Sequence, residues 1–350
     1  MKRLLQKILP KKRHFLGIDI GASYIKAAEV KIIDGEPTVV ALRKHPSPQG
    51  VWTEQLDEQA LVEALKEVVN PPLKEVITCI GGEKLVSRVV RFPRMSEKEL
   101  EAAVKFEVEK FVPTPTDQLL IRYVCLGPVG NNNRENTQNM ENVLLLAVPA
   151  ATVYQYYGIF SRAGMLVTAV DFQAFALWRL FGRKPEAGTF ALLDIGARTS
   201  HFVVVRDGLI RFLRLLPVGG DSLTEYLMET YGLEFDKAQQ MKEEADLSPS
   251  VEAESPGVLQ TADVFRDGLL ELTKELQRSL EYFSAQEKLS VEKLVLSGGT
   301  SNMKGLDSYL QEVLGLPVEI GIPDVAFSDG VEFDPCFSVA IGLALREVVS

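Results

Sequence analysis

Hydrophobic and polar positions along the chain alternate with two different periods. Short apolar runs bounded by glycine, proline or an Asp-Gly turn predict strands, at His14–Asp19, Ser23–Lys31, Pro37–Lys44, Glu75–Ile80, Leu85–Phe92, Leu119–Leu126, Asn142–Val148, Leu166–Val170, Phe190–Asp194, Ser200–Arg206, Leu209–Leu216 and Lys293–Leu296. Apolar residues recurring every three or four positions predict helices, one beginning at Asp57 and others at Ser96–Phe111, Ala151–Ala163, Phe172–Phe181, Ser222–Tyr231, Phe235–Glu244, Asp263–Lys288, Gly305–Leu314 and Pro335–Val349. This mixture predicts an α/β protein.

Two of the predicted strands end in the same four residues, Asp-Ile-Gly-Ala, at 19–22 and 194–197. A hydroxylic residue and a second apolar strand follow in both copies, with Ser23 in the first and Thr199 in the second. Glycine lets the backbone approach a phosphate closely, and successive amides in such a turn bind anions. The repetition predicts two similar domains that face each other across a nucleotide cleft. The alternative is that each aspartate only caps its hairpin turn.

A third glycine-bearing segment is Ser297-Gly298-Gly299-Thr300, which lies between a predicted strand and a predicted helix. The diglycine and the helix N-terminus are suited to holding an anion or to packing beneath a nucleoside. Lys26, on the strand after the first hairpin, can return to the phosphates as a point charge. Gly219-Gly220 ends the strand that follows the second hairpin.

Residues 84–163 read as an insertion with its own order, strand-helix-strand-strand-helix. Ser96 and Glu99 form a capping box that opens the helix, and Pro113 ends it. The polar stretch Gly130–Glu141 is expected to be a mobile hairpin tip.

Composition narrows the class of protein. At 350 residues, 46% hydrophobic and 25% charged, the chain is long enough for two or more soluble domains. A formal charge of −10 argues against a general nucleic-acid binder. No apolar run is long enough to span a bilayer, and no secretory signal is present. The cysteines and histidines are isolated, which favours buried thiols in a reducing cytosol over a zinc site or a disulfide framework; they are Cys79, Cys125, Cys336, His14, His45 and His201.

The leader Met1–Arg13 is a candidate surface anchor. Its apolar residues share one helical face, and it carries six cations. Such a helix can lie on an anionic leaflet, although Pro10 limits it to under three turns. The alternatives are a frayed basic segment and a helix packed on a partner.

The three glycine-bearing segments together resemble the nucleotide motifs of the actin, DnaK-type chaperone and sugar-kinase superfamily. The phosphate motifs would be Asp19–Lys26 and Asp194–Ser200, and the adenosine motif Ser297–Leu306. The insertion resembles the extra subdomain of FtsA, the cell-division actin. The chain is most similar to the PilM family of the type IV pilus assembly platform, on the further evidence of Ala103–Pro115, Pro217–Thr224 and Leu276–Phe283.

The resemblance implies a two-lobed, ribonuclease H-like actin fold with an FtsA-like inserted βαββα subdomain. We expect a basic leader (1–13), a first-lobe core (14–83, 164–187 and 324–350), the inserted subdomain (84–163), a second-lobe core (188–218 and 291–323) and a helical subdomain (219–290).

The resemblance also implies that ATP and Mg²⁺ bind in the cleft. Asp19 and Asp194 would hold magnesium through water, because Mg²⁺ keeps most of its own waters. The other residues that it assigns to the nucleotide are Gly21, Ala22, Ser23, Lys26, Gly196, Thr199, Gly219, Gly220, Lys242, Gly298, Gly299 and Thr300. The family usually has an acidic residue where this chain has Gln239.

For hydrolysis, Gln173 matches the glutamine of actin that orients water, and Asp171 is the nearest carboxylate. A carboxamide cannot accept a proton, so a general base would have to be Asp171 or the phosphate itself. The alternative for Asp171 is a helix N-cap. A nucleotide-gated scaffold with at most slow ATPase activity fits better than a fast enzyme.

The same resemblance implies a cytoplasmic protein at the inner membrane that acts in pilus assembly and twitching motility. Its partners would be the N-terminal tail of a PilN-like membrane protein and the pilus motor ATPases. We place the tail in a groove between the first lobe and the inserted subdomain, near Phe106, Glu107, Glu109 and Val112. The alternative for Phe106 is packing within the subdomain. Competing functions are an FtsA-like membrane tether, which would normally extend past the last helix here, a sugar or carboxylate kinase, and a polymerising actin.

Overall fold

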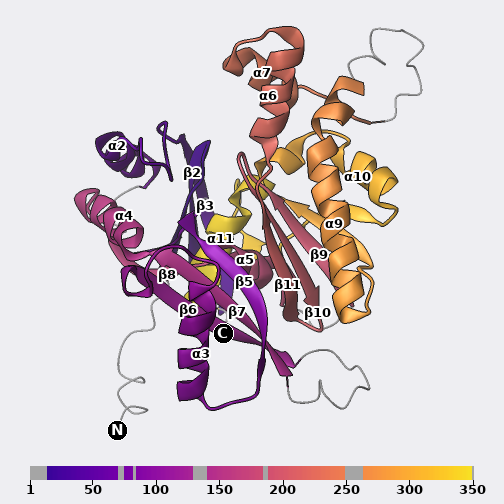
Figure 1. Cartoon of the computed structure of the whole chain (residues 1–350). Helices are drawn as coiled ribbons and strands as arrows, with labels where there is room; N and C mark the ends of the chain where they lie inside the picture. Colours follow the sequence, from indigo (N-terminus) through magenta and orange to yellow (C-terminus); the bar gives the residue numbers. More distant parts are fainter. Residues whose placement is uncertain are drawn as a thin grey trace.

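The structure is a computed structural model that describes residues 14–69, 75–81, 84–128, 140–183, 188–248 and 263–348. The leader Met1–Arg13, most of the polar stretch Gly130–Glu141 and the end of the last predicted helix at Val349 lie outside the described residues. The described strands form three sheets (Figure 1). Within this part of the chain, no helix has both the length and the apolarity to cross a bilayer.

The first sheet has the strand order β14-β3-β2-β1-β4-β8. Its strands are β1 (His14–Ile20), β2 (Tyr24–Ile33), β3 (Glu36–Pro46), β4 (Glu75–Cys79), β8 (Leu166–Asp171) and β14 (Ala326–Phe327). Helices α2 (Glu58–Val68) and α4 (Ala150–Arg162) share one apolar core with β1, and α11 (Ser338–Ala344) shares another. Because helices cover both faces, every residue of β1 after His14 is buried, and buried and exposed positions do not alternate along the strand.

Gly17 shows how closely α11 packs on this sheet. A Cβ atom at Gly17 would lie 2.1 Å from the carbonyl oxygen of Ala340. Any larger residue at position 17 would therefore force α11 away from β1, the strand that carries Asp19.

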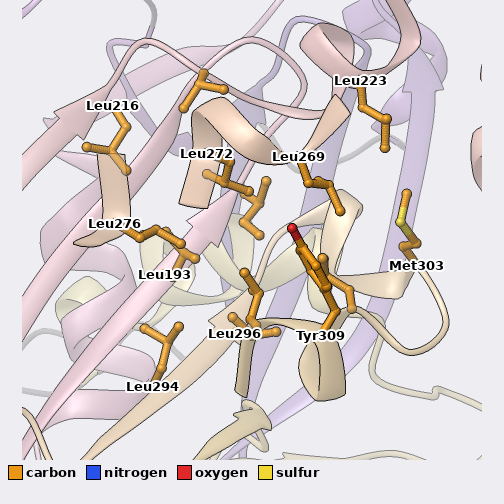
Figure 2. Close-up of a cluster of buried hydrophobic side chains, with 14 of the residues drawn as sticks. Leu193, Leu216, Leu223, Leu269, Leu272, Leu276, Leu294, Leu296, Met303 and Tyr309 are labelled. Atoms are coloured by element: carbon orange, nitrogen blue, oxygen red, sulfur yellow. The ribbon is translucent and has the colours of Figure 1, made fainter. Parts of the chain in front are cut away.

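The second sheet has the strand order β11-β10-β9-β12-β13. Its strands are β9 (Thr189–Ile195), β10 (Ser200–Arg206), β11 (Leu209–Leu216), β12 (Lys293–Ser297) and β13 (Val318–Ile320). Helices α6 (Gly220–Tyr231), α7 (Phe235–Glu243) and α9 (Leu270–Glu287) lie between β11 and β12, and α10 (Leu306–Leu314) lies between β12 and β13. Leucines from β9, β12, α6 and α9 meet Met303 and Tyr309 in one core, which Figure 2 shows.

The third sheet, order β5-β7-β6, is built by the insertion. Its elements are β5 (Val86–Pro93), α3 (Glu97–Glu109), β6 (Leu119–Pro128) and β7 (Met140–Pro149). The predicted capping box is confirmed, because Ser96 Oγ accepts from the Glu99 N–H and the Glu99 carboxylate accepts from the Ser96 N–H. The predicted element order is confirmed too, but α4, which closes it, packs against α2 in the core of the first sheet.

Two predicted helices are interrupted. The segment Asp263–Lys288 is helical at 263–268 and again from Leu270, with a turn at Leu269 between them. Gly268 explains the break: glycine is a poor helix former, and a Cβ there would lie 2.4 Å from Leu223 Cδ1 of α6. The segment Phe172–Phe181 starts as α5 (Gln173–Leu177) and then widens into a π-helical turn, Trp178–Gly182.

Candidate functional site

A cavity of about 430 Å³ lies between the first and second sheets, where the β1–β2 and β9–β10 hairpins turn. This volume is within the usual range for a small-molecule site. The predicted nucleotide and catalytic residues that line the cavity come from both hairpins, from α5 (Gln173–Leu177), from α7 and from the segment after β12. They are Asp19, Gly21, Ala22, Ser23, Lys26, Gln173, Asp194, Gly196, Thr199, Lys242, Gly299 and Thr300.

The two hairpins turn in the same way. The Gly21 N–H donates to the Tyr24 carbonyl (3.0 Å), and the Gly196 N–H donates to the Thr199 carbonyl (3.1 Å). Backbone groups thus close both turns without the aspartate side chains, so turn capping does not account for Asp19 and Asp194. Both carboxylates instead line the cavity.

Lys26 and Asp19 form a buried ion pair at the floor of the cavity. They face each other across the β1–β2 ladder, and the lysine Nζ lies 2.7 Å from the aspartate Oδ2. Burial disfavours the lysine charge, but the carboxylates of Asp19 and Asp194 outweigh it and raise the pKa of Lys26 to about 12. Gln173 Nε2 donates to the other Asp19 oxygen at 3.4 Å. This site therefore keeps a fixed positive charge.

Asp194 is the second acid of the cavity. Burial raises its pKa to about 6, Lys26 counteracts this, and the nearby Asp19 charge adds to it. The two buried carboxylates, Asp19 and Asp194, lie near a single ammonium group, that of Lys26. A hydrated divalent cation would neutralise the excess negative charge. Among the described residues, no cluster of three or more acidic, histidine or cysteine side chains could hold a metal directly. The site fits Mg²⁺ that keeps most of its waters.

Three of the predicted nucleotide glycines, Gly219, Gly220 and Gly298, do not line the cavity. A Cβ at Gly219 would lie 2.4 Å from the Ala197 carbonyl oxygen, and one at Gly298, whose φ is +86°, would lie 2.5 Å from the Ile195 carbonyl oxygen. These glycines let the segments after β11 and β12 pack directly on the second hairpin. They therefore allow the close packing that shapes the site, but they do not themselves line the cavity.

Lys242 on α7 borders the opposite side of the cavity. Its Nζ donates to the Gly220 carbonyl (3.0 Å) and to Thr224 Oγ1 (2.8 Å). Burial lowers its pKa, although Asp221 and Glu243 work in the opposite direction. This lysine therefore also joins α7 to the start of α6. Gln239, which stands where the family usually has an acidic residue, lies on the same helix and also lines the cavity.

Asp171 lies outside the cavity lining. Its Oδ2 pairs with Arg179 (2.9 Å) and Arg346 (3.3 Å), and its Oδ1 accepts from the Phe172 N–H at 2.8 Å. The N-cap of α5 is Phe172, so the helix-cap alternative was wrong. Both carboxylate oxygens are therefore engaged by two guanidinium groups and a backbone N–H outside the cavity. The placement does not support a general-base role.

His201, which the sequence analysis treated as isolated, lines the cavity. It is paired with Asp194 across the β9–β10 ladder. Burial lowers its pKa to about 4, against the opposing charge of Asp19, so the imidazole is neutral at physiological pH. The sequence feature that could have identified His201 as a site residue is its position, seven residues after Asp194 on the second strand of the same hairpin.

Trp52 also lines the cavity. Its φ of +66° is rare for a non-glycine residue. The indole N–H donates to the Ile20 carbonyl (2.7 Å), and the ring stacks on Tyr156 of α4 with 4.0 Å between centroids. These contacts hold the loop after β3 against the first hairpin. No periodicity marks this loop, so its position against the hairpin could not be predicted from the sequence pattern.

The residues predicted for partner binding divide into two groups. Phe106 on α3 is 65% exposed, so the alternative that it packs within the subdomain was wrong. Glu107 pairs with Lys110 (2.6 Å), and Glu109 accepts from Thr116 Oγ1 at 3.4 Å. Val112, in contrast, is buried in the core between α3 and the third sheet, so it cannot border a surface groove.

The cysteines differ in exposure. Cys79 is buried, Cys336 is partly buried and lines the cavity, and Cys125 is exposed. The expectation of buried thiols was therefore wrong for Cys125, because β6 is an edge strand whose side chains reach the surface there.

The chain is similar in sequence and in structure to known proteins. The sequence family described as type IV pilus assembly protein PilM matches residues 17–348. A chain of a PilM-PilN type IV pilus biogenesis complex is 30% identical, with a TM-score of 0.81 over 97% of this chain and 99% of that chain. The cell division protein FtsA of Pseudomonas aeruginosa is 24% identical over 376 residues, which cover 94% of this chain and 88% of that protein.

A more distant structural likeness identifies the fold. MreB5 of Spiroplasma citri bound to ADP has a TM-score of 0.53 at 14% identity, with 97% of this chain and 98% of that chain covered. At this identity the likeness shows the fold alone. The predicted two-lobed actin-like α/β fold is confirmed.

Proposed function

The chain belongs to the family of type IV pilus assembly proteins described as PilM, and from this premise we propose that it is an ATP-binding scaffold of the pilus assembly platform. The observation that carries the proposal is the cavity between the two Asp-Ile-Gly-Ala hairpins, where a buried lysine–carboxylate pair lies beside a second carboxylate. The proposed location is the cytoplasmic side of the inner membrane.

The described residues fit magnesium and ATP. Lys26 and the backbone of Gly21–Ser23 would hold phosphate from one side, and Gly196 with Thr199 from the other. Asp19 and Asp194 would hold the hydrated magnesium ion, which neutralises phosphate charge when bound. Gly299, Thr300 and Lys242 would border the nucleoside, on the side of the cavity that α7 lines.

The cavity supports slow hydrolysis at most. Gln173 is positioned by its hydrogen bond to Asp19, and a carboxamide orients water without accepting its proton. His201 lines the same cavity and is neutral, but the burial that lowers its pKa to about 4 makes it a weak base, so in our proposal the protein groups orient the water and the phosphate itself accepts the proton.

We further propose that the chain binds the N-terminal tail of a PilN-like membrane protein. The structural relative was solved as a PilM-PilN complex. Phe106 supports a surface near α3, because its aromatic ring is 65% exposed and is therefore available for contact with a partner. Glu107 and Glu109 would lie at the rim. The pilus motor ATPases remain a second class of proposed partner.

Binding of ATP can be tested by thermal melting of nucleotide-stripped protein. At 100 times the Kd, a ligand stabilises the folded state by about 2.7 kcal/mol. ATP with Mg²⁺ should therefore raise the Tm of wild type, and Asp194→Asn should remove most of the magnesium-dependent part. Asp329→Asn is the control, because Asp329 is an exposed aspartate outside the cavity. An unchanged Tm in the wild type would refute the site.

A further inference from the structure

A second cavity, of about 700 Å³, lies where the third sheet meets the second. Residues of β5, β11 and the C-terminal half of α9 line it, and none of the predicted site residues does. Figure 1 shows β5 and β11 running close together there, and the two strands are in contact. The cavity is thus separate from the nucleotide site and from the α3 surface.

The two strands that border this second cavity, called the groove below, are both edge strands of their sheets. Among the described strands, β5 pairs with β7 alone and β11 pairs with β10 alone. An edge strand has backbone N–H and C=O groups without strand partners, which an extended peptide can use. The floor is apolar and includes Val89 and Leu213. Tyr282 of α9, 55% exposed, lies over it with its ring 5.6 Å from that of Phe212.

The groove is basic on a chain whose formal charge is −10. Five arginines and a single acidic residue, Glu287, line it. Glu287 pairs with Arg91 at 3.2 Å, and Glu275, just outside the lining, pairs with two more of the arginines. Across the described part of the chain, Arg88 and Arg211 have no carboxylate at ion-pair distance; the Arg88 guanidinium lies over the Phe111 ring, 5.2 Å from its centroid. The lining arginines are Arg88, Arg91, Arg211, Arg214 and Arg278.

We propose that this groove binds an extended, acidic segment of a partner protein in which glutamate or aspartate alternates with apolar residues. Side chains of an extended peptide point alternately to opposite sides, so one set would meet the arginines while the other meets the apolar floor. Arginine is the residue suited to bidentate recognition of carboxylates. The excess negative charge of the whole chain disfavours a polyanion such as nucleic acid over a short acidic peptide.

The experiment uses full-length protein without nucleotide and two fluorescent octapeptides, one alternating glutamate with leucine and one alternating lysine with leucine. We expect the acidic peptide to bind and the basic one not to bind. The double variant Arg88→Glu/Arg211→Glu should weaken binding of the acidic peptide about tenfold or more. Arg122→Glu is the single-site charge-reversal control, because Arg122 is an exposed arginine on β6, at the other edge of the third sheet.

Three results would overturn the proposal: equal binding of both peptides, equal loss of affinity in Arg122→Glu, or unchanged affinity in the double variant. Tighter binding of a single-stranded oligonucleotide than of the acidic peptide would also overturn it. Hydrogen exchange gives a second readout, since the bound peptide should protect amides within 86–93 and 209–216. A failure here leaves the nucleotide site intact, because the two cavities share no lining residue.

Discussion

Replacing Asp194 with asparagine should stabilise the nucleotide-free protein while it weakens the site. The carboxylate is 8% exposed, and it lies in a cavity that already contains the Asp19 charge. Burial and that neighbouring charge both make its ionised form unfavourable. An asparagine of the same shape removes the charge but retains polar atoms that can hydrogen bond. Asp194→Asn should therefore raise the stability of the nucleotide-free protein and lower its affinity for ATP with Mg²⁺.

The magnitude follows from the pKa, which rises from 3.8 to about 6 on folding. At about 1.4 kcal/mol per pH unit, the ionised carboxylate destabilises the folded state by an amount on the order of 3 kcal/mol. The folded state binds the proton more tightly than the unfolded state does. The destabilisation is therefore absent below the unfolded value of 3.8 and complete above about pH 6. Allowing for relaxation around the charge, we expect Asp194→Asn to gain about 1–3 kcal/mol at pH 8.

The assay is urea unfolding of wild type, Asp194→Asn and the control Asp329→Asn at pH 5, 6, 7 and 8, without nucleotide or magnesium. The gain of Asp194→Asn over wild type should already be present in part at pH 5, grow up to about pH 6 and then level off. With saturating ATP and Mg²⁺ the order should reverse, because only the wild type binds the ion well. If Asp194→Asn is less stable than wild type at pH 8 without ligand, the electrostatic argument is refuted.

Three further changes test other parts of the site. Lys26→Met leaves Asp19 buried without its partner and should cost about 3–5 kcal/mol in urea unfolding; adding Asp19→Asn should recover most of this loss, and no recovery would contradict the ion-pair argument. Gln173→Ala and His201→Asn should each slow single-turnover phosphate release without weakening ATP binding, whereas equal turnover in all three proteins would exclude both from hydrolysis. Phe106→Ala should weaken binding of a labelled PilN-type tail peptide without changing the Tm, because the ring is 65% exposed; unchanged affinity would remove this residue from the partner site.

The sequence predicted the parts of the site that depend on local pattern. Both hairpins, the capping box at Ser96 and most strands follow from short-range rules, and the structure has them within a few residues of the expected positions. What depends on tertiary packing was not predictable in this way. Trp52 is placed by the stacking on Tyr156, 104 residues away along the chain. The exposure of Phe106 and the burial of Val112 depend on how α3 lies on its sheet.

Asp171 illustrates the same limit and also shows how the site is held in place. Two guanidinium groups from different segments, Arg179 of the π-helical turn and Arg346 near the C-terminus, hold its carboxylate. Arg179 also donates to the Gly342 carbonyl of α11 at 2.6 Å. Gln173, two residues further on, begins α5 and reaches Asp19. These ion pairs fix the junction of β8 and α5 against α11, two residues before Gln173, and sequence spacing alone could not distinguish such a structural position from direct participation in the chemistry.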